Sequence, residues 1–243
     1  MGAIYRREML AYFTCPTGYV FAAIFFAFSG VLFSISTFGM QSSETGTYFT
    51  LMLVAFIVLI PLLTMKLLSE ERGSKTEQIL LTSPVSLMGM ISAKFLAAYT
   101  LFAGTLISSA AFNIYMLYRV AKEQTDVIEK LNLPAVIGSV VGILLIGGVF
   151  VAIGLFLSAL TETQIVAAVS SIGTFVLLFL LSIVPNYIGN SVIRTVIRWV
   201  SVFDRYSVFT TGIFDFTAIV YYISLTVVFL FLTIRVYEKR RWA

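Results

Sequence analysis

The residues best suited to chemistry gather in one short segment of this chain, LLSEERGSKTEQILLTSPVS at positions 67–86. Its G-S-K-T is close to the pattern of a phosphate-binding loop, in which backbone amides and a lysine cradle the phosphates of a nucleotide. That loop requires G-x-x-x-x-G-K-[ST] between a strand and a helix. Here Ser74 separates Gly73 from Lys75, no glycine stands at the upstream position, and an apolar run precedes the segment. We therefore do not expect this chain to hydrolyse a nucleotide itself.

The same segment carries the signals that start and stop a helix. Ser74 and Glu77 form a capping box, and Pro84 ends the helix after about two turns. A helix this short is marginal in water, so we expect the adjoining spans, the headgroup layer or a partner protein to hold it. The apolar run at 79–81 would offer a partner a surface. The alternative is a polar loop that only separates two spans.

Histidine is absent from the chain, and Cys15 is its one cysteine. A single Cys cannot form an internal disulfide, and both a Cys/His metal site and Ser-His-Asp catalysis are excluded. We therefore expect no catalytic residue, no metal site and no cofactor in this chain. The net charge of +4 suits segments that face an anionic leaflet better than a nucleic-acid surface. Membrane lipid, and not nucleic acid, is the expected partner.

The remaining sequence is strongly apolar and divides into six intervals. Of the 243 residues, 59% are hydrophobic and only 12% are charged, against about 25% charged residues in soluble domains. A helix that crosses a bilayer needs roughly 20 apolar residues. We therefore expect an all-α polytopic membrane protein with a single transmembrane domain over residues 1–243. The six predicted spans are 17–39, 47–68, 87–117, 134–160, 163–184 and 216–236.

Two segments outside the spans, and the length of the third span, carry further expectations. Residues 3–14 predict a short amphipathic helix in the interface plane. Residues 185–215 mix polar and apolar side chains, which predicts short helices that do not span. The third predicted span has 31 residues and would be about 46 Å long, against a hydrocarbon core of about 30 Å. We expect its excess, which carries Lys94, to project into the cytoplasm as a rigid lever.

The distribution of Lys and Arg predicts the orientation of the chain. With the N-terminus inside, ten basic residues fall in inside segments and six in outside segments. The C-terminal EKRRWA is the strongest element of this bias. We therefore expect both termini in the cytoplasm, together with residues 67–86 and the short connection at 161–164. The 185–215 segment is then outside.

None of the six apolar intervals holds a charged residue near its centre. Ion-coupled transporters usually place charged residues or histidine within the membrane. The pattern therefore favours a machine whose energy comes from outside the bilayer. Two alternatives stay open at this point: an ion-coupled secondary carrier or channel, and a membrane scaffold that transports nothing.

Three groups of motifs carry a family resemblance. The first is Glu70-Glu71-Arg72, Thr76-Glu77 and LLTSPVS at 80–86; the second is LSALTETQ at 157–164; the third is FDRYSVF at 203–209, GIFD at 212–215 and VYYISLT at 220–226. In order and spacing, the chain resembles the membrane subunits of ABC transporters of the type-2 exporter class. Within that class it is most similar to the gliding-motility-type and copper-enzyme-maturation-type permeases. Many relatives have a histidine-containing stretch where this chain has residues 204–206, so no role of that histidine transfers.

The resemblance implies a non-catalytic permease subunit of the bacterial cytoplasmic membrane. It would pair with a second permease, identical or different, and with separate ABC ATPase subunits that bind ATP and Mg²⁺. Their hydrolysis of ATP would drive export or extraction of a substrate. Residues 3–14 would be an elbow helix, 74–82 a coupling helix that docks into the ATPase, and 191–214 external helices that close the outer mouth. The dimer interface would be built from the first and fifth spans.

The same resemblance assigns individual residues to two regions. The ATPase-coupling residues would be Glu70, Glu71, Arg72, Ser74, Glu77, Leu80, Leu81 and Glu162. The outer gate region would contain Phe203, Asp204, Phe209 and Asp215.

Overall fold

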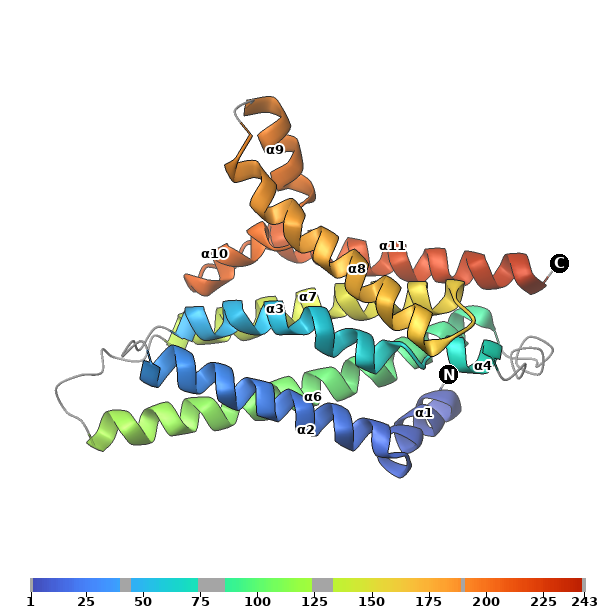
Figure 1. Ribbon diagram of the computed structural model, residues 1–243, viewed down its shortest axis with the longest axis horizontal. Coiled ribbons are helices and arrows are strands. Elements are labelled where there is room, and N and C mark those ends of the chain that lie inside the picture. The colour runs from blue at the N-terminus through green and yellow to red at the C-terminus, as the bar shows by residue number, and fades with distance from the viewer. Residues whose placement is uncertain (1, 40–44, 74–85, 124–132, 189–190, 242–243) are drawn as a thin grey trace.

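The computed structural model describes residues 2–39, 45–73, 86–123, 133–188 and 191–241, and within these ranges it is helical without a strand (Figure 1). Six of its helices are long and apolar enough to span a membrane: Pro16–Ser36, Gly46–Gly73, Leu87–Met116, Pro134–Leu160, Gln164–Ile183 and Phe216–Arg241. This confirms the expected all-α class with six apolar helices. The single domain over residues 1–243 stays a prediction.

The helices follow one another in a simple order along the chain. They are α1 Gly2–Thr14, α2 Pro16–Phe33, α3 Thr45–Thr64, α4 Ser69–Gly73, α6 Leu87–Glu123, α7 Leu133–Leu160, α8 Gln164–Ile183, α9 Ser191–Val200, α10 Ser207–Thr210 and α11 Phe216–Arg241. Shorter turns of π- or 3₁₀-helix are η1 Ser34–Gly39, η2 Val184–Asn186 and η3 Asp204–Tyr206. Short helices thus lie between α8 and α11, as expected for residues 185–215.

The long helices run roughly side by side, with α7 in the middle of the bundle (Figure 1). α7 packs against α11, α3, α8 and α6, and its central residues from Ile143 to Ile153 include many that are fully buried. The two chain ends lie on the same side of the molecule as α4 (Figure 1). We call this side the α4 end and the opposite side the α10 end.

Glycines on α7 let its neighbours approach closely. A Cβ added at Gly147 would run into the ring of Phe102 on α6, and one added at Gly154 would run into Thr64 on α3. Phe102 has no room to withdraw, because it is fully buried and its ring packs against those of Phe25 and Phe56. Small residues at such positions allow helices in a membrane to pack without a hydrophobic driving force.

A buried polar cluster joins α2, α3 and α6. The Ser29 hydroxyl is 2.7 Å from the Tyr48 hydroxyl, is hydrogen-bonded to Ser109, and accepts from the Asn113 amide at 3.2 Å. All four residues are buried. Hydrogen bonds between helices stabilise association at membrane depth, where water offers no alternative partner. These four residues therefore fix the contact of the three helices.

Three of the long helices expose broad apolar faces. On α8, Ile165, Val169 and Leu177 are each more than 60% exposed, and α2 and α11 also bury only a minor share of their residues. α9 stands away from the bundle at the end of α8 (Figure 1). In a membrane these faces meet lipid or another chain.

The close approach of α7 and α6 gives a first prediction. We expect Gly147→Ala to destabilise the protein by about 1–3 kcal/mol, because the new methyl group overpacks a fully occupied site. Thermal unfolding of the purified protein in detergent measures this as a melting temperature lowered by several degrees. The control is Gly104→Ala on α6, where an added Cβ meets nothing within 4 Å. Equal melting temperatures for the two variants would contradict the packing described here.

Candidate functional site

A serine of α7 holds the joint between α3 and α4 at the α4 end. The Ser158 hydroxyl on α7 accepts hydrogen bonds from the backbone N–H groups of Leu68 and Ser69, at 3.2 and 3.1 Å, and donates to the carbonyl of Met65 at 3.2 Å. A hydroxyl offers one donor and two acceptor positions, so Ser158 uses its full capacity on this turn. The two N–H groups stand at the start of α4, where no helical carbonyl is available to accept from them, and the Met65 carbonyl after α3 also accepts from the Ser69 hydroxyl.

A buried lysine on α6 joins three elements at this end. The Lys94 ammonium is 2.8 Å from Glu71 on α4 and 3.2 Å from Glu8 on α1, and it donates to the carbonyl of Leu67 at 2.9 Å. An ammonium has three donors, and all three are used. Arg7 adds ion pairs to Glu8 at 2.7 Å and to Glu71 at 3.4 Å. We call Arg7, Glu8, Glu71 and Lys94 the lysine cluster.

The position of Lys94 adds a feature that the sequence expectation did not contain. Its side chain is only 2% exposed and packs against α1 and α4, while the projection of this end of α6 into the cytoplasm as a lever stays a prediction. A lysine is buried only at a large desolvation cost unless opposite charges and hydrogen bonds compensate, and here two carboxylates and a carbonyl do so. The sequence expectation missed this because it treated α6 alone, without the carboxylates that α1 and α4 supply.

The charges of the lysine cluster also change the acidity of Glu8. Burial by itself raises the pKa of this carboxyl, but the neighbouring charges of Lys94 and Arg7 outweigh burial and lower the pKa below its ordinary value. Glu8 is therefore ionised at neutral pH, and the ion pairs persist there. This holds α1 against α6 and α4.

A second ion pair ties α4 to the connection between α7 and α8. One guanidinium nitrogen of Arg72 is 2.6 Å from the Glu162 carboxylate, and the other donates to the carbonyl of Leu160 at 2.8 Å. Leu160 is the last residue of α7, where a cation is favoured by the unpaired carbonyls. A Cβ added at Gly73 would lie 3.0 Å from the carbonyl of Glu162. The end of α4 and this connection are therefore in close contact.

The same connection is fixed from two other sides. The Arg240 guanidinium of α11 donates to the carbonyl of Ala159 at 2.5 Å. The Thr163 hydroxyl caps α8 by accepting from the N–H of Val166 at 3.4 Å. The turn that carries Glu162 is therefore held by α4, by α11 and by its own helix cap.

The structure brings together four of the eight residues expected to couple to an ATPase. Glu70, Glu71 and Arg72 lie on α4, and Glu162 is paired with Arg72. The other four fall outside the described residues: Ser74, Glu77, Leu80 and Leu81. Sequence reasoning named none of Arg7, Glu8 and Ser158 for this site. The sequence held one indication for Arg7 and Glu8. They form a charged pair on a helix expected at the membrane interface, on the side where the third span begins.

The four residues expected in an outer gate lie at the α10 end. Phe203 packs edge-on against Phe150 and Phe179, at centroid distances of 5.7 and 5.5 Å, and Phe209 is fully buried. Asp215 accepts from the N–H of Thr217 at 2.8 Å and so caps α11. Asp204 begins η3. These contacts are those of packing and capping residues, and a gating role stays a prediction.

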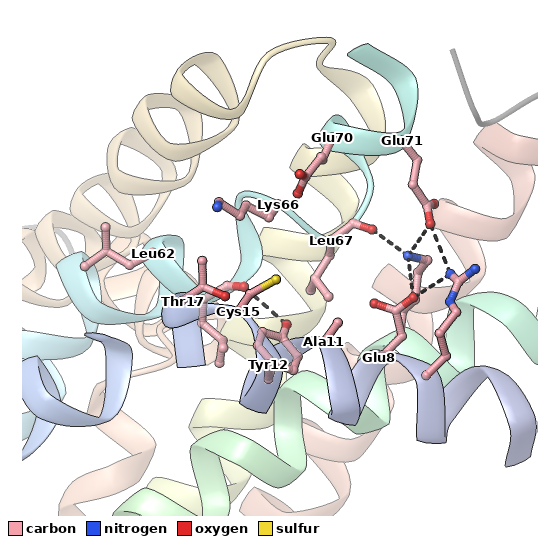
Figure 2. Close-up of a pocket in the computed structure, with 13 residues that line it drawn as sticks. Glu8, Ala11, Tyr12, Cys15, Thr17, Leu62, Lys66, Leu67, Glu70 and Glu71 are labelled. Atoms are coloured by element: carbon pink, nitrogen blue, oxygen red, sulfur yellow. Dashed lines mark hydrogen bonds and ion pairs between the residues drawn. The ribbon is translucent and has the colours of Figure 1, made fainter. Parts of the chain in front are cut away.

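A cavity of about 530 Å³ opens beside the lysine cluster. One wall comes from α1 and the start of α2, with Glu8, Tyr12 and Cys15, and the other from the end of α3 and from α4, with Lys66 and Glu70 (Figure 2). Across the residues that the structure describes, no group of three or more His, Cys, Asp or Glu is placed to hold a metal ion. The interactions described at this end are ion pairs and hydrogen bonds.

The buried charge of Lys94 gives a prediction on stability. We expect Lys94→Met to destabilise the protein by about 3–5 kcal/mol, because it leaves two carboxylates in a site built for a cation. The triple variant with Glu8→Gln and Glu71→Gln removes these charges and should regain most of the loss. Thermal unfolding in detergent measures both. Lys239→Met, an exposed lysine of α11, is the control, and a Lys94→Met variant as stable as this control would contradict the role of the cluster.

Comparison with known proteins identifies the family. A family model described as ABC-2 family transporter protein matches residues 21–242, from within α2 to the end of α11. No curated protein matches the chain. The chain therefore belongs to the ABC-2 transporter family, as a non-catalytic membrane permease whose nucleotide is bound by a separate ABC ATPase.

Proposed function

We propose that this permease exports or extracts a substrate across the bacterial cytoplasmic membrane, and that its ATPase docks at the α4 end. The observation that carries this proposal is the Arg72–Glu162 ion pair. It joins two segments, far apart along the chain, to which the family resemblance gives contact with the ATPase. A docked partner would therefore meet one continuous surface instead of two separate loops. Residues 74–85, which include the expected coupling helix, follow α4 directly.

The charge distribution supports a cytoplasmic α4 end. The last turn of α11 holds Lys239, Arg240 and Arg241, and both termini are on this side (Figure 1). Basic residues next to spans favour the cytoplasm. In this orientation α9 and α10 face outward, and Phe203, Asp204, Phe209 and Asp215 belong to the outer gate region.

Two sets of contacts would carry force from the ATPase into the membrane. Through Glu71, a displacement of α4 would pull on Lys94 and Glu8, and so on α6 and α1. Through Arg72, it would pull on Glu162 and on the end of α7, and so on α8. Because α7 is the central helix of the bundle, movement of its end is felt by most of the other spans.

A second permease subunit would complete the transporter. The apolar faces of α2 and α8 leave most of these helices exposed in a single chain. They are the first and fifth spans, at which we place the interface with an identical or related permease. The substrate path would then run between the two subunits.

Charge reversal tests the proposed docking end. In a complex with its partner ABC ATPase, we expect Arg72→Glu or Glu162→Arg to lower the ATP hydrolysis rate about fivefold. This corresponds to about 1 kcal/mol, within the range for residues in contact. The double variant restores the ion pair with reversed charges and should recover most of the rate. The readouts are co-purification of the ATPase and its hydrolysis rate in nanodiscs.

A matched control for this experiment lies on α11. Arg235 and Glu238 form an exposed ion pair at 2.8 Å, and its reversal should leave the rate unchanged. If no ATPase co-purifies, and the rate is the same in every variant, the proposed coupling role is wrong and a scaffold function is favoured. Transport that follows an ion gradient without ATP would instead favour a secondary carrier.

The orientation has a separate test by thiol labelling of intact cells. In a Cys15→Ala background, Ser191→Cys on α9 should react with a membrane-impermeant maleimide, and Lys239→Cys on α11 should react only after permeabilisation. Both positions are exposed, so access to the side chain does not limit labelling. The reverse pattern would place the termini outside.

A further inference from the structure

We propose that the cavity beside the lysine cluster binds the phosphate-bearing headgroup of a membrane lipid, with Lys66 as the residue that holds the phosphate. The cavity lies between α1–α2 on one side and α3–α4 on the other, and Lys66 and Glu70 are on the side opposite Cys15 and Thr17 (Figure 2).

The charges of the cavity single out Lys66. Three cations line it: Arg7, Lys66 and Lys94. Arg7 and Lys94 are neutralised by Glu8 and Glu71 within the lysine cluster. In contrast, the Lys66 ammonium makes no ion pair or hydrogen bond with any residue that the structure describes, and the nearby Glu70 is engaged in an interaction of its own. A lysine in this state favours an anion, and phosphate is the anion that lysine commonly binds as a point charge.

An apolar stripe leads from Lys66 along the outer face of α3. Leu62, Val58 and Val54 precede Lys66 at intervals of four residues, and each is between 37% and 48% exposed. Residues four apart lie on one face of a helix, so the stripe is continuous. The eight steps from Val54 to Leu62 cover about 12 Å, most of the depth of one leaflet in a hydrocarbon core of about 30 Å, and Lys66 lies in the turn just beyond the end of α3. An acyl chain can follow this stripe while its phosphate stays at Lys66.

The size and lining of the cavity fit a lipid headgroup better than a free phosphate ion. A volume of about 530 Å³ is in the range of sites for whole small molecules. The lining also includes Ala11, Leu63 and Leu67 beside the charged groups, and such a mixed wall suits the boundary between headgroup and chain. The lipid would belong to the leaflet at the α4 end and would contact α1, α2 and α3 together.

The single cysteine of the chain provides a direct probe. Cys15 is exposed and lines the cavity, so a bound headgroup should slow its alkylation by N-ethylmaleimide. The experiment uses the full-length protein, delipidated in a neutral detergent. Three ligands are added separately: dioleoylphosphatidylglycerol, dioleoylglycerol, which has the same chains without phosphate, and inorganic phosphate. Native mass spectrometry counts the molecules retained, and the rate of alkylation reports occupancy next to Cys15.

We expect the phosphatidylglycerol alone to be retained and to slow alkylation severalfold. In Lys66→Gln the affinity should fall about tenfold, as for the loss of one hydrogen bond to a charged group, and Lys66→Arg should keep it. Lys239→Gln, on the same end but outside the cavity, is the matched control. A melting temperature of Lys66→Gln equal to that of the parent protein shows that the fold is intact.

Three results would each overturn the proposal. If dioleoylglycerol binds as well as the phosphatidylglycerol, or if Lys66→Gln binds like the parent protein, the phosphate is not recognised. If inorganic phosphate alone protects Cys15 in a manner that depends on Lys66, the cavity is a site for free phosphate and not for a lipid. The assay contains no ATPase, so its outcome is independent of the proposed coupling role.

Discussion

The arrangement of the α4 end depends on the burial of one ammonium group. Lys94 is withdrawn from water on a helix that is otherwise apolar at this level, and such a group is tolerated only with its charge and its donors fully compensated. No single neighbouring helix supplies enough acceptors. Glu8, Glu71 and the carbonyl of Leu67 must therefore converge on it from α1, from α4 and from the turn before α4. The charge thereby fixes the relative positions of these elements.

This constraint makes α4 the junction of two ion-pair systems. Two consecutive residues of α4 contact different neighbours. Glu71 pairs with Lys94 of α6, and Arg72 pairs with Glu162 beyond the end of α7. The pairs differ in exposure. Lys94 is buried, whereas the Glu162 side chain is 70% exposed, and exposed pairs contribute little to stability. The buried contact of Glu71 with Lys94 thus contributes more to stability. The exposed contact of Arg72 with Glu162 is the one that a docked partner can rearrange at a small cost in free energy.

Hydropathy and charge placement were sufficient to predict the helical class and the six apolar helices, because both are local properties of the sequence. They also predicted that Glu70, Glu71 and Arg72 lie on the same side of the bundle as the two chain ends, which is where α4 lies (Figure 1). The lysine cluster could not be predicted in this way, since Glu8, Glu71 and Lys94 are distant in the sequence and each looks like an ordinary boundary charge. Ser158 was equally hidden: a serine in an apolar helix is usually bonded within its own helix, and only the fold shows that it serves the turn after α3.

The joint held by Ser158 has a consequence for how this region can vary. All three of its hydrogen bonds to the turn go to backbone groups, at Met65, Leu68 and Ser69. The Ser69 hydroxyl also bonds to the Met65 carbonyl, and Lys94 donates to the Leu67 carbonyl. Among the described residues, the backbone of the turn is therefore held from α7, from α6 and by Ser69, without a contribution from the Lys66 side chain. Lys66 can therefore be replaced without loss of the joint. The residue type at this position can then depend on the ligand of the adjacent cavity. Related permeases that share the serine can differ at this position and still present α4 in the same place.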